Sequence, residues 1–360
     1  MRGGRTGVRG ARTRGTRPAR PEVARDSGPG GWEDQGMAET ETTPASSRPS
    51  AASAHAERPL PTGPQYAIES DGYRAVLTGV GAGLRSLTHE GRRLVLDYPE
   101  DHLPIGAAGE ILIPWPNRVA DGRYTFEGAE QQLDLTEPAL HNAIHGLTRR
   151  QLWSVERHTE REVRFTLRLY PQHGYPHFLD LAVEYAVGGH GLSVEVFATN
   201  SGTTAAPYGL GWHPYLTLAT EAVDEAVLQL PASEWIPVDD RMIPTGRQPV
   251  DGTDYDFRQA RRVGATRLDT AFTGLRREAD GLVHVRLADA AGAHGVRLWA
   301  AEGLDWVQLF TGDTLPEGHR RAGVAVEPMT CPPNAFATGE DLIRLAPGES
   351  VSHRWGVTAF

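Results

Sequence analysis

The chain has 360 residues, a net charge of −10 and a pI of about 5.8, which argue against nucleic acid or an anionic membrane surface as a partner. Its 36 basic residues are all arginine, and the absence of lysine excludes Schiff-base catalysis, attachment of pyridoxal phosphate and a P-loop. The single Cys331 excludes an intramolecular disulfide and a cysteine-based zinc site. No apolar run approaches the length of a membrane span and no signal-peptide pattern occurs, so we expect a cytoplasmic protein.

Residues 1–64 differ in composition from the rest of the chain. Eight arginines lie among Gly, Pro, Thr and Ala in residues 1–25, and the stretch that follows is rich in Ala, Ser, Thr and Pro. Such segments bury too little apolar surface to offset the entropy of ordering, so we predict a disordered tail. A nucleic-acid or targeting arm is the alternative to a tail without function. Met37 is a plausible start of translation. In that case the first 36 residues come from a gene start assigned too far upstream.

From Gln65 onwards, apolar side chains recur with a period of two, which indicates β-strands. Residues 163–169 and 181–187 alternate in this way, and Gly188–Gly191 then turns the chain into a further alternating run. Further hairpin turns are predicted at residues 90–91, 127–128 and 291–292. No helical stripe of three turns is present. The pattern therefore predicts one all-β domain, residues 65–360, built as a large antiparallel sandwich.

The first candidate site lies between Gly109 and Leu147. An apolar run there ends in Pro-Trp-Pro, where the prolines interrupt any strand, and Asn117-Arg118 follows. The segment ends on His145-Gly146. Polar and planar side chains on loops bounded by strands are suited to binding a small polar ligand.

The second candidate is His213, in the run Tyr-Gly-Leu-Gly-Trp-His-Pro-Tyr from 208 to 215. We expect it at a strand end, where it could exchange a proton with a ligand of sugar size, while Trp212 and Tyr215 stack on the ligand. Gly209 and Gly211 would allow the backbone to come close to another group. The alternative is a hydrogen-bonded packing histidine.

The third candidate is Glu327, which we expect at the last position of an apolar strand. Partial burial there would raise its pKa and make it a stronger base, whereas an edge charge facing water is the alternative. Asp269 and Gln308 are single polar residues within apolar runs, for which surface-facing strand positions are the alternative. His141 and His145 have the spacing of a zinc pair, but the glycine that follows argues against a helix there.

These pieces together resemble the aldose 1-epimerase family, whose fold is the galactose-mutarotase-like β-super-sandwich. The resemblance runs in order from about Tyr66 to Phe360. It rests on six motifs, namely Asn117-Arg118 with Gly122-Arg-Tyr-Thr-Phe, Asn142-Ala-Ile-His145-Gly, His213-Pro-Tyr215, Asp269, Gln308-Leu-Phe-Thr-Gly and Glu327-Pro.

The resemblance implies interconversion of the α and β anomers of a free hexopyranose. It implies Glu327 as the general base and His213 as the general acid, which open and reclose the ring without cofactor, metal or covalent intermediate. The remaining positions would hold the sugar's hydroxyls and ring oxygen, and they are Asn117, Arg118, His145, Tyr215, Asp269 and Gln308. The expected partner is a small sugar, with no nucleic acid or membrane, and the chain is expected as a monomer or homodimer.

Gly-Trp-His-Pro-Tyr departs from the galactose-type pattern at Trp212 and Pro214, and resembles a bacterial aldose-epimerase-like branch. The sugar's identity therefore stays open. A phosphorylated or sulfonated hexose is an alternative because Arg118, Arg149 and Arg150 lie near the His145 loop, although surface arginines are the commoner explanation in a protein whose basic residues are all arginine. A sugar-binding module without activity is a second alternative. A metal-dependent β-sandwich enzyme using His141, His145 and Glu327 is a third.

Overall fold

The computed structural model describes residues 59–219 and 222–360. Residues 1–58, most of the predicted tail, lie outside the described residues, so that part of the prediction stays a prediction. Strands begin at Gln65, and all strand pairings in the described ranges are antiparallel, as predicted. In the same ranges, no helix is long and apolar enough to cross a membrane.

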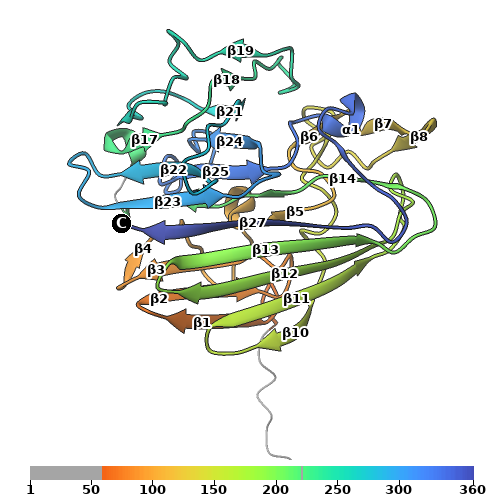
Figure 1. The fold of residues 1–360 in the computed structure, drawn as a ribbon, viewed down its shortest axis with the longest axis horizontal. Coiled ribbons are helices and arrows are strands. Elements are labelled where there is room, and N and C mark those ends of the chain that lie inside the picture. Colours follow the sequence, from red (N-terminus) through yellow and green to blue (C-terminus); the bar gives the residue numbers. More distant parts are fainter. Residues whose placement is uncertain (1–58, 220–221) are drawn as a thin grey trace, which may run out of the picture. The chain divides into compact units, whose positions relative to one another are not determined.

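The largest sheet has nine strands and forms one layer, which faces the viewer in Figure 1. In spatial order its strands are β10 (Ser154–His158), β11 (Glu162–Leu169), β12 (Leu179–Gly188), β13 (Gly191–Asn200), β27 (Ser350–Ala359), β23 (Gly295–Ala300), β22 (Val283–Ala288), β17 (Val227–Gln229) and β20 (Arg261–Arg262). The C-terminal strand β27 thus lies in the middle of the sheet, between strands from earlier parts of the chain.

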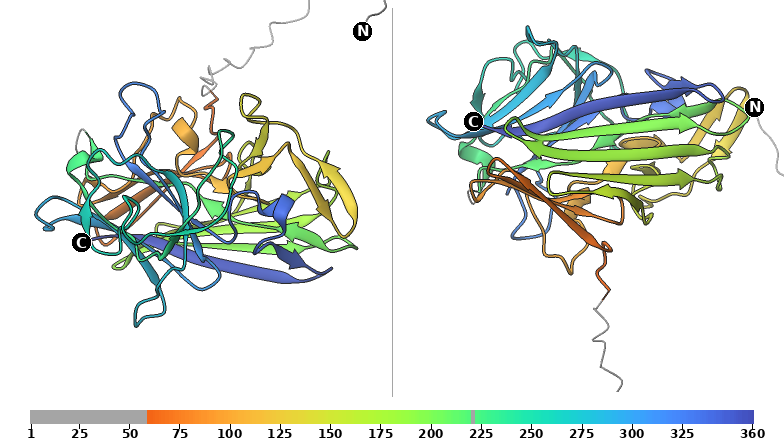
Figure 2. Two further views of the ribbon diagram at one scale, coloured as in Figure 1. Left: turned by 90° about the horizontal axis from the view of Figure 1, so that it is seen from above. Right: turned by 60° about the horizontal axis from the view of Figure 1, so that its bottom comes forward.

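Two further sheets pack behind the first (Figures 1 and 2). The four-stranded sheet contains β1 (Gln65–Ser70), β2 (Tyr73–Thr78), β3 (Leu84–His89) and β4 (Arg92–Arg93). The eight-stranded sheet contains, in order, β19 (Gln248–Pro249), β18 (Glu234–Trp235), β21 (Asp269–Thr273), β24 (Trp306–Phe310), β25 (Val324–Met329), β15 (Gly211–Trp212) and β5 (Ile111–Leu112), and β16 (Tyr215–Leu216) pairs with β25.

Short elements complete the described chain. Three two-stranded ribbons are formed by β6 (Arg118–Ala120) with β9 (Asn142–Ile144), β7 (Arg123–Phe126) with β8 (Ala129–Gln132), and β14 (Ala206–Tyr208) with β26 (Ile343–Leu345). The helical segments are the 3₁₀ turns η1 (Ile105–Ala107) and η2 (Val223–Glu225) and the single-turn helix α1 (Ala335–Thr338). This scarcity of helix agrees with the absence of a 3.6-residue stripe in the sequence.

Apolar residues alternate with polar ones along the strands because every second side chain is buried in the core. Val163 and Phe165 of β11 are fully buried, whereas the intervening residues on the strand face outwards. Each fully buried side chain of this size contributes about 1.5–3 kcal/mol from the hydrophobic effect. The layers meet where the ring of Trp212 from β15 packs against Trp355 from β27, with 5.7 Å between the ring centroids.

The predicted hairpins are confirmed. Gly188 pairs with Gly191 at the turn between β12 and β13. The turns at residues 90–91, 127–128 and 291–292 join β3 to β4, β7 to β8 and β22 to β23. Turn chemistry and alternation together therefore determined these local pairings, which lie in the nine-stranded sheet, the four-stranded sheet and the β7–β8 ribbon.

Candidate active site

Three adjacent strands of the eight-stranded sheet present polar side chains to one another. Gln308 in β24 lies directly opposite Glu327 in β25, and Asp269 begins the neighbouring strand β21. Gln308 donates from Nε2 to Oδ1 of Asp269 over 2.7 Å. Gln308 and Glu327 are 3 % and 1 % exposed, so neither faces water. Glu327 lies inside β25 rather than at its last position, which corrects the prediction and explains its complete burial.

His213 lies between β15 and β16, where Pro214 interrupts the pairing with β25. Its backbone N–H donates to the carbonyl of Glu110 (3.1 Å), and its carbonyl accepts from Gly109 (2.8 Å). These two bonds tie the loop after β15 to the start of β5. His213 is 5 % exposed, and its ring lies 5.1 Å from that of Tyr215.

For this segment, the expected stacking of Trp212 on a ligand was wrong, whereas the expected close approach at Gly211 is confirmed. Trp212 is fully buried and donates from Nε1 to the carbonyl of Gly109 (3.2 Å), so it packs in the core instead of stacking on a ligand. Gly211 makes room for protein, since a Cβ there would lie 2.7 Å from Cβ of Pro116. Tyr215 does face the cavity described below, but its hydroxyl donates to the carbonyl of Gly106 (2.9 Å).

Asn117 and His145 lie opposite each other at one end of the β6–β9 ribbon, and both have left-handed backbone angles, with φ of 53° and 62°. Reciprocal bonds hold them in this conformation, which non-glycine residues rarely adopt. The N–H of His145 donates to the carbonyl of Asn117 (2.9 Å), and the N–H of Asn117 donates to Nδ1 of His145 (3.2 Å). Because Nδ1 accepts, a neutral His145 carries its proton on Nε2 and can donate from there.

Arg118 is the first residue of β6, and its guanidinium is held by Glu137. Nε donates to Oε2 over 2.8 Å and Nη2 donates to Oε1 over 2.9 Å, a bidentate arrangement. The Arg118 side chain is 12 % exposed. The pairing carboxylate comes from the loop before β9, in a part of the chain for which no role was predicted.

All eight predicted site residues line one cavity of about 360 Å³. This volume is in the range of small-molecule sites in proteins. The sequence-predicted residues in its wall are Asn117, Arg118, His145, His213, Tyr215, Asp269, Gln308 and Glu327, and the others are Pro104, Gly106, Ala107, Ile144, Arg149, Phe310, Thr314 and Leu315. The polar residues are therefore brought together from six separate segments, and the apolar ones come mainly from residues 104–107 and 310–315.

At the centre of this wall, Nε2 of His213 lies 3.2 Å from Oε1 of Glu327. Burial raises the pKa of Glu327 well above its usual value, and the nearby carboxylate of Asp269 adds to this effect. Burial also lowers the pKa of His213 to about 3, with the charge of Arg149 acting in the same direction. Both causes favour the uncharged forms, so the pair holds one proton over a wide pH range, with the carboxyl protonated.

Burial affects the other titratable groups of the wall in the same manner. It lowers the pKa of His145 well below the usual value, and the positive charges of neighbouring side chains contribute. It raises the pKa of Asp269, although Arg118 and Gln308 oppose this. The cavity thus offers a neutral imidazole and weakly acidic carboxyl groups, which are suited to proton exchange with hydroxyl oxygens.

Sequence reasoning did not find Arg149 as a cavity residue, although it noted Arg149 near the His145 loop. Its Nε donates to the carboxylate of Glu110, which also accepts from Nη1 of Arg150. The Glu110 side chain is 3 % exposed, whereas the Arg150 side chain is half exposed. A lone carboxylate at the start of an apolar run was the available signal, because such a group needs a buried partner.

The histidine pair considered for zinc is not assembled as a site. His141 does not line the cavity, and its Nδ1 lies 2.7 Å from the carboxylate of Asp121 with the side chain 62 % exposed. In residues 59–219 and 222–360, no group of three His, Cys, Asp or Glu side chains is placed to hold a metal ion.

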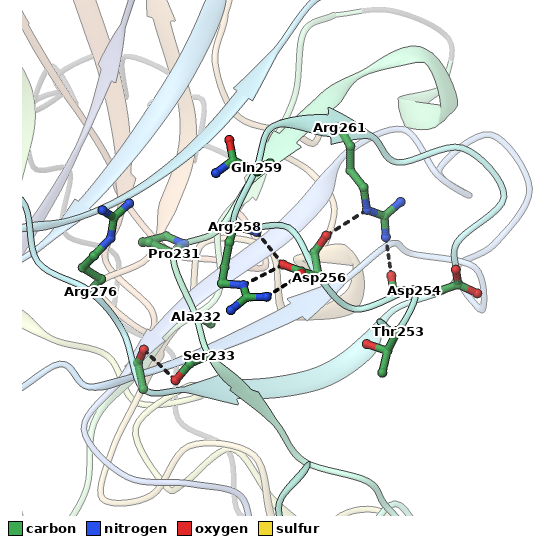
Figure 3. A pocket seen from close by; sticks show the side chains of 11 residues that line it. Pro231, Ala232, Ser233, Thr253, Asp254, Asp256, Arg258, Gln259, Arg261 and Arg276 are labelled. Carbon is green, nitrogen blue, oxygen red and sulfur yellow. Dashed lines mark hydrogen bonds and ion pairs between the residues drawn. The ribbon is translucent and has the colours of Figure 1, made fainter. Parts of the chain in front are cut away.

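A larger hollow of about 710 Å³ lies on the loops around β18 to β20 (Figure 3). Figure 3 shows the pair of Arg258 and Asp256 in its wall, whose Nη2 and Oδ2 are 2.7 Å apart. Arg261 donates to the backbone carbonyl of Asp256 over 3.1 Å. None of the eight predicted residues lines this hollow.

The similarity of this chain to known proteins identifies its family. The model of the family described as Aldose 1-epimerase matches residues 64–358, nearly all of the described chain. The chain belongs to the aldose 1-epimerase family. It is 40 % identical over 289 residues to the uncharacterized protein YihR of Escherichia coli (strain K12), covering 80 % of this chain and 91 % of that protein.

Two further proteins show lower sequence identity to this chain. Galactose mutarotase of Mus musculus is 28 % identical over 266 residues, which cover 68 % of this chain and 76 % of that enzyme. Among solved structures, the GalM/aldose epimerase homologue from C. elegans superposes with a TM-score of 0.73 at 21 % identity, covering 82 % and 98 % of the two chains. That structural likeness confirms the predicted galactose-mutarotase-like fold.

Proposed function

We propose that this aldose 1-epimerase family member interconverts the α and β anomers of a free hexopyranose, with Glu327 and His213 exchanging protons with the sugar. The observation that carries the proposal is the 3.2 Å contact between these two groups inside a cavity lined by all eight expected residues. A module that only binds sugar has no need for a buried acid–base pair, so this contact favours the enzyme.

The proton balance follows from the chemistry of the hemiacetal. With the shared proton on His213, Glu327 takes the proton of the anomeric hydroxyl while His213 gives its proton to the ring oxygen. The bond between C1 and O5 breaks, C1 becomes a carbonyl, and the pair is left as a carboxylic acid beside a neutral imidazole. Burial favours that protonation state, which is also the resting state of the pair, so the reacting form with an ionised Glu327 and a protonated His213 is its minor tautomer. Reclosure on either face of C1 reverses both transfers.

The direct contact between the two groups suits this reaction. The anomeric oxygen and the ring oxygen are both bonded to C1, so two groups in contact can reach both oxygens of one sugar. Nε2–H of His145 and the guanidinium of Arg118 are donors for oxygens that gain charge as the ring opens. The amide of Gln308 and the carboxyl of Asp269 hold each other in place to accept or donate to further hydroxyls.

An anionic hexose is the second candidate substrate, and the position of Arg149 in the cavity wall favours it. Arg149 and Arg150 share the carboxylate of Glu110, so the three side chains carry a net positive charge beside the cavity. A phosphate or sulfonate on the sugar would be attracted to this end of the wall.

The test is anomer exchange by NMR with glucose, galactose, glucose 6-phosphate and a 6-sulfonated hexose. Wild type, Glu327→Gln and His213→Asn are compared in the presence and absence of EDTA. We expect faster exchange in the wild type and a loss of at least about 100-fold in each variant, as is usual when a general acid or base is removed. The ranking of the four sugars identifies the substrate class. Binding of sugar without acceleration in the wild type would overturn the proposal in favour of a binding module.

A further inference from the structure

Arg118 is connected to the protein surface by a continuous chain of hydrogen bonds outside the cavity. Glu137 accepts from Arg118 with both carboxylate oxygens, and Oε2 also accepts from Nδ2 of Asn142 over 3.1 Å. The same Nδ2 donates to the carbonyl of Arg241 over 3.0 Å. Four residues from β6, the loop before β9, β9 and the connection between β18 and β19 are therefore linked in one network.

Glu137 itself is held firmly. Its backbone N–H donates to the carbonyl of Asn142 (2.9 Å), and the N–H of Asn142 donates back to the carbonyl of Glu137 (3.1 Å). Asn142 is completely buried, so its amide cannot exchange these partners for water. Burial opposes ionisation of Glu137, but the bonds from Arg118 and Asn142 outweigh it and lower its pKa. Glu137 is consequently a charged acceptor with one orientation.

Arg241 closes the outer end of the network. Its Nε donates to the carbonyl of Leu140 (3.1 Å), and its Nη2 donates to the carbonyl of His141 and to Oδ1 of Asp121, both over 2.9 Å. These acceptors lie together at one end of the β6–β9 ribbon, opposite the end that carries Asn117 and His145. Asp121 and His141 both have left-handed backbone angles, with φ of 56° and 59°, so bonds to this region stabilise an otherwise unfavourable conformation.

The donors of Arg118 are divided between this network and the cavity. Glu137 occupies Nε and one edge of Nη2, and Nη1 makes no hydrogen bond to any described residue. Without Glu137, the long side chain would be free to adopt several rotamers and to pair with Asp269 or Glu327 in the wall.

We propose that Glu137, Asn142 and Arg241 form a positioning unit that fixes the guanidinium of Arg118 against the sugar. The inference rests on the proposed sugar site, and it gives roles to Asn142 and to the 137–142 loop, neither of which touches the cavity. It also explains how an aldose epimerase site holds an arginine beside two carboxyl groups without an ion pair forming across the cavity.

The first experiment measures kcat and KM for anomer exchange in wild type, Arg118→Gln, Glu137→Gln and the double variant. A displacement of a binding group by about 1 Å can reduce activity by about 100-fold, so we expect Glu137→Gln to lower kcat/KM by about 10-fold to 100-fold, mainly through KM. The double variant should match Arg118→Gln within a factor of about two, because Glu137 acts only through Arg118. Losses that multiply would overturn the proposal.

Controls separate positioning from general damage to the fold. Glu127→Gln removes a half-exposed carboxylate at the turn of the β7–β8 hairpin, where it pairs with Arg344 of β26, and it should leave both constants unchanged. Arg241→Gln should raise KM by a smaller factor of about three, because the backbone bonds of Asn142 remain. Thermal unfolding of each variant shows whether a change in KM accompanies a loss of stability. A large fall in Tm with an unchanged KM would make Glu137 merely structural and overturn the proposal.

A readout without catalysis makes the outcome independent of the proposed function. The Nε–H signal of Arg118, assigned in a ¹⁵N spectrum by its loss in Arg118→Gln, should exchange slowly with water in the wild type and rapidly in Glu137→Gln. If the wild type does not accelerate exchange, the proposed function fails, whereas the positioning unit is still tested by this signal. An Arg118 signal that is equally protected in Glu137→Gln would overturn the inference.

Discussion

Nε2 of His213 lies 3.2 Å from Oε1 of Glu327, at a place where burial favours the uncharged form of both side chains. Burial of this pair lowers the free energy of unfolding at any pH at which the carboxyl group is protonated in the folded state but ionised in the unfolded chain. The same burial keeps a single proton available to both groups. Stability and proton exchange are therefore opposed at this position, which is common at catalytic sites.

Glu327→Gln should raise the stability of the protein at neutral pH. The pKa of Glu327 is raised in the folded state, so its contribution is favourable below the unfolded value near 4.5 and is lost as pH rises towards the folded value. Glutamine does not titrate. We expect Tm to increase by about 2 °C or more at pH 8, and by less at pH 4.5. Scanning calorimetry at both pH values measures this, and a variant that is less stable at pH 8 would contradict it.

Anomer exchange should show a broad pH plateau. The pair accepts a second proton only when His213 is protonated, and burial lowers that pKa to about 3. It loses its proton only as pH rises through the raised pKa of Glu327. We therefore expect kcat/KM to fall below about pH 4 and to show no break near 6.5, the ordinary histidine value. Polarimetry corrected for the spontaneous reaction measures the profile. An inflection between about pH 6 and 7 would show that His213 titrates normally.

His145 should remain neutral with its proton on Nε2. Its Nδ1 accepts from the N–H of Asn117, and burial lowers its pKa well below the usual value. Long-range ¹H–¹⁵N NMR should show this tautomer unchanged between pH 5 and 8, a window that spans the ordinary histidine titration. The exposed His173 is a suitable internal comparison. A proton on Nδ1 would contradict the assigned donor role of His145.

Glu110→Gln should destabilise the protein markedly. The carboxylate is buried between Arg149 and Arg150, and removing one partner of a buried ion pair typically costs about 3–5 kcal/mol. Because Arg150 can turn to solvent, we expect a loss near the lower end, about 3 kcal/mol. Arg150→Gln removes the half-exposed partner and should cost less than about 1 kcal/mol. Urea unfolding of both variants provides the comparison, and equal losses would contradict the prediction by showing that the half-exposed Arg150 accounts for the whole effect of the carboxylate.

Local patterns predicted the strands well because alternation and turn residues act over a few positions. The hairpin at Gly188–Gly191 and the strands on either side needed no knowledge of distant residues. Trp212 was assigned incorrectly for the opposite reason. Its partner is Trp355, 143 positions later, and only their packing shows that the indole faces the core rather than the cavity.

The sequence by itself determined the all-β class, the main hairpins and, through the resemblance to aldose 1-epimerases, eight residues that line one cavity. Tertiary structure decided how those residues are held. The partners of Arg118 and Arg149 are Glu137 and Glu110, which lie 19 and 39 positions away, and no short-range pattern specifies such pairs. Side-chain chemistry is encoded locally, whereas burial, which sets the pKa of Glu327 and His213, exists only when distant strands come together.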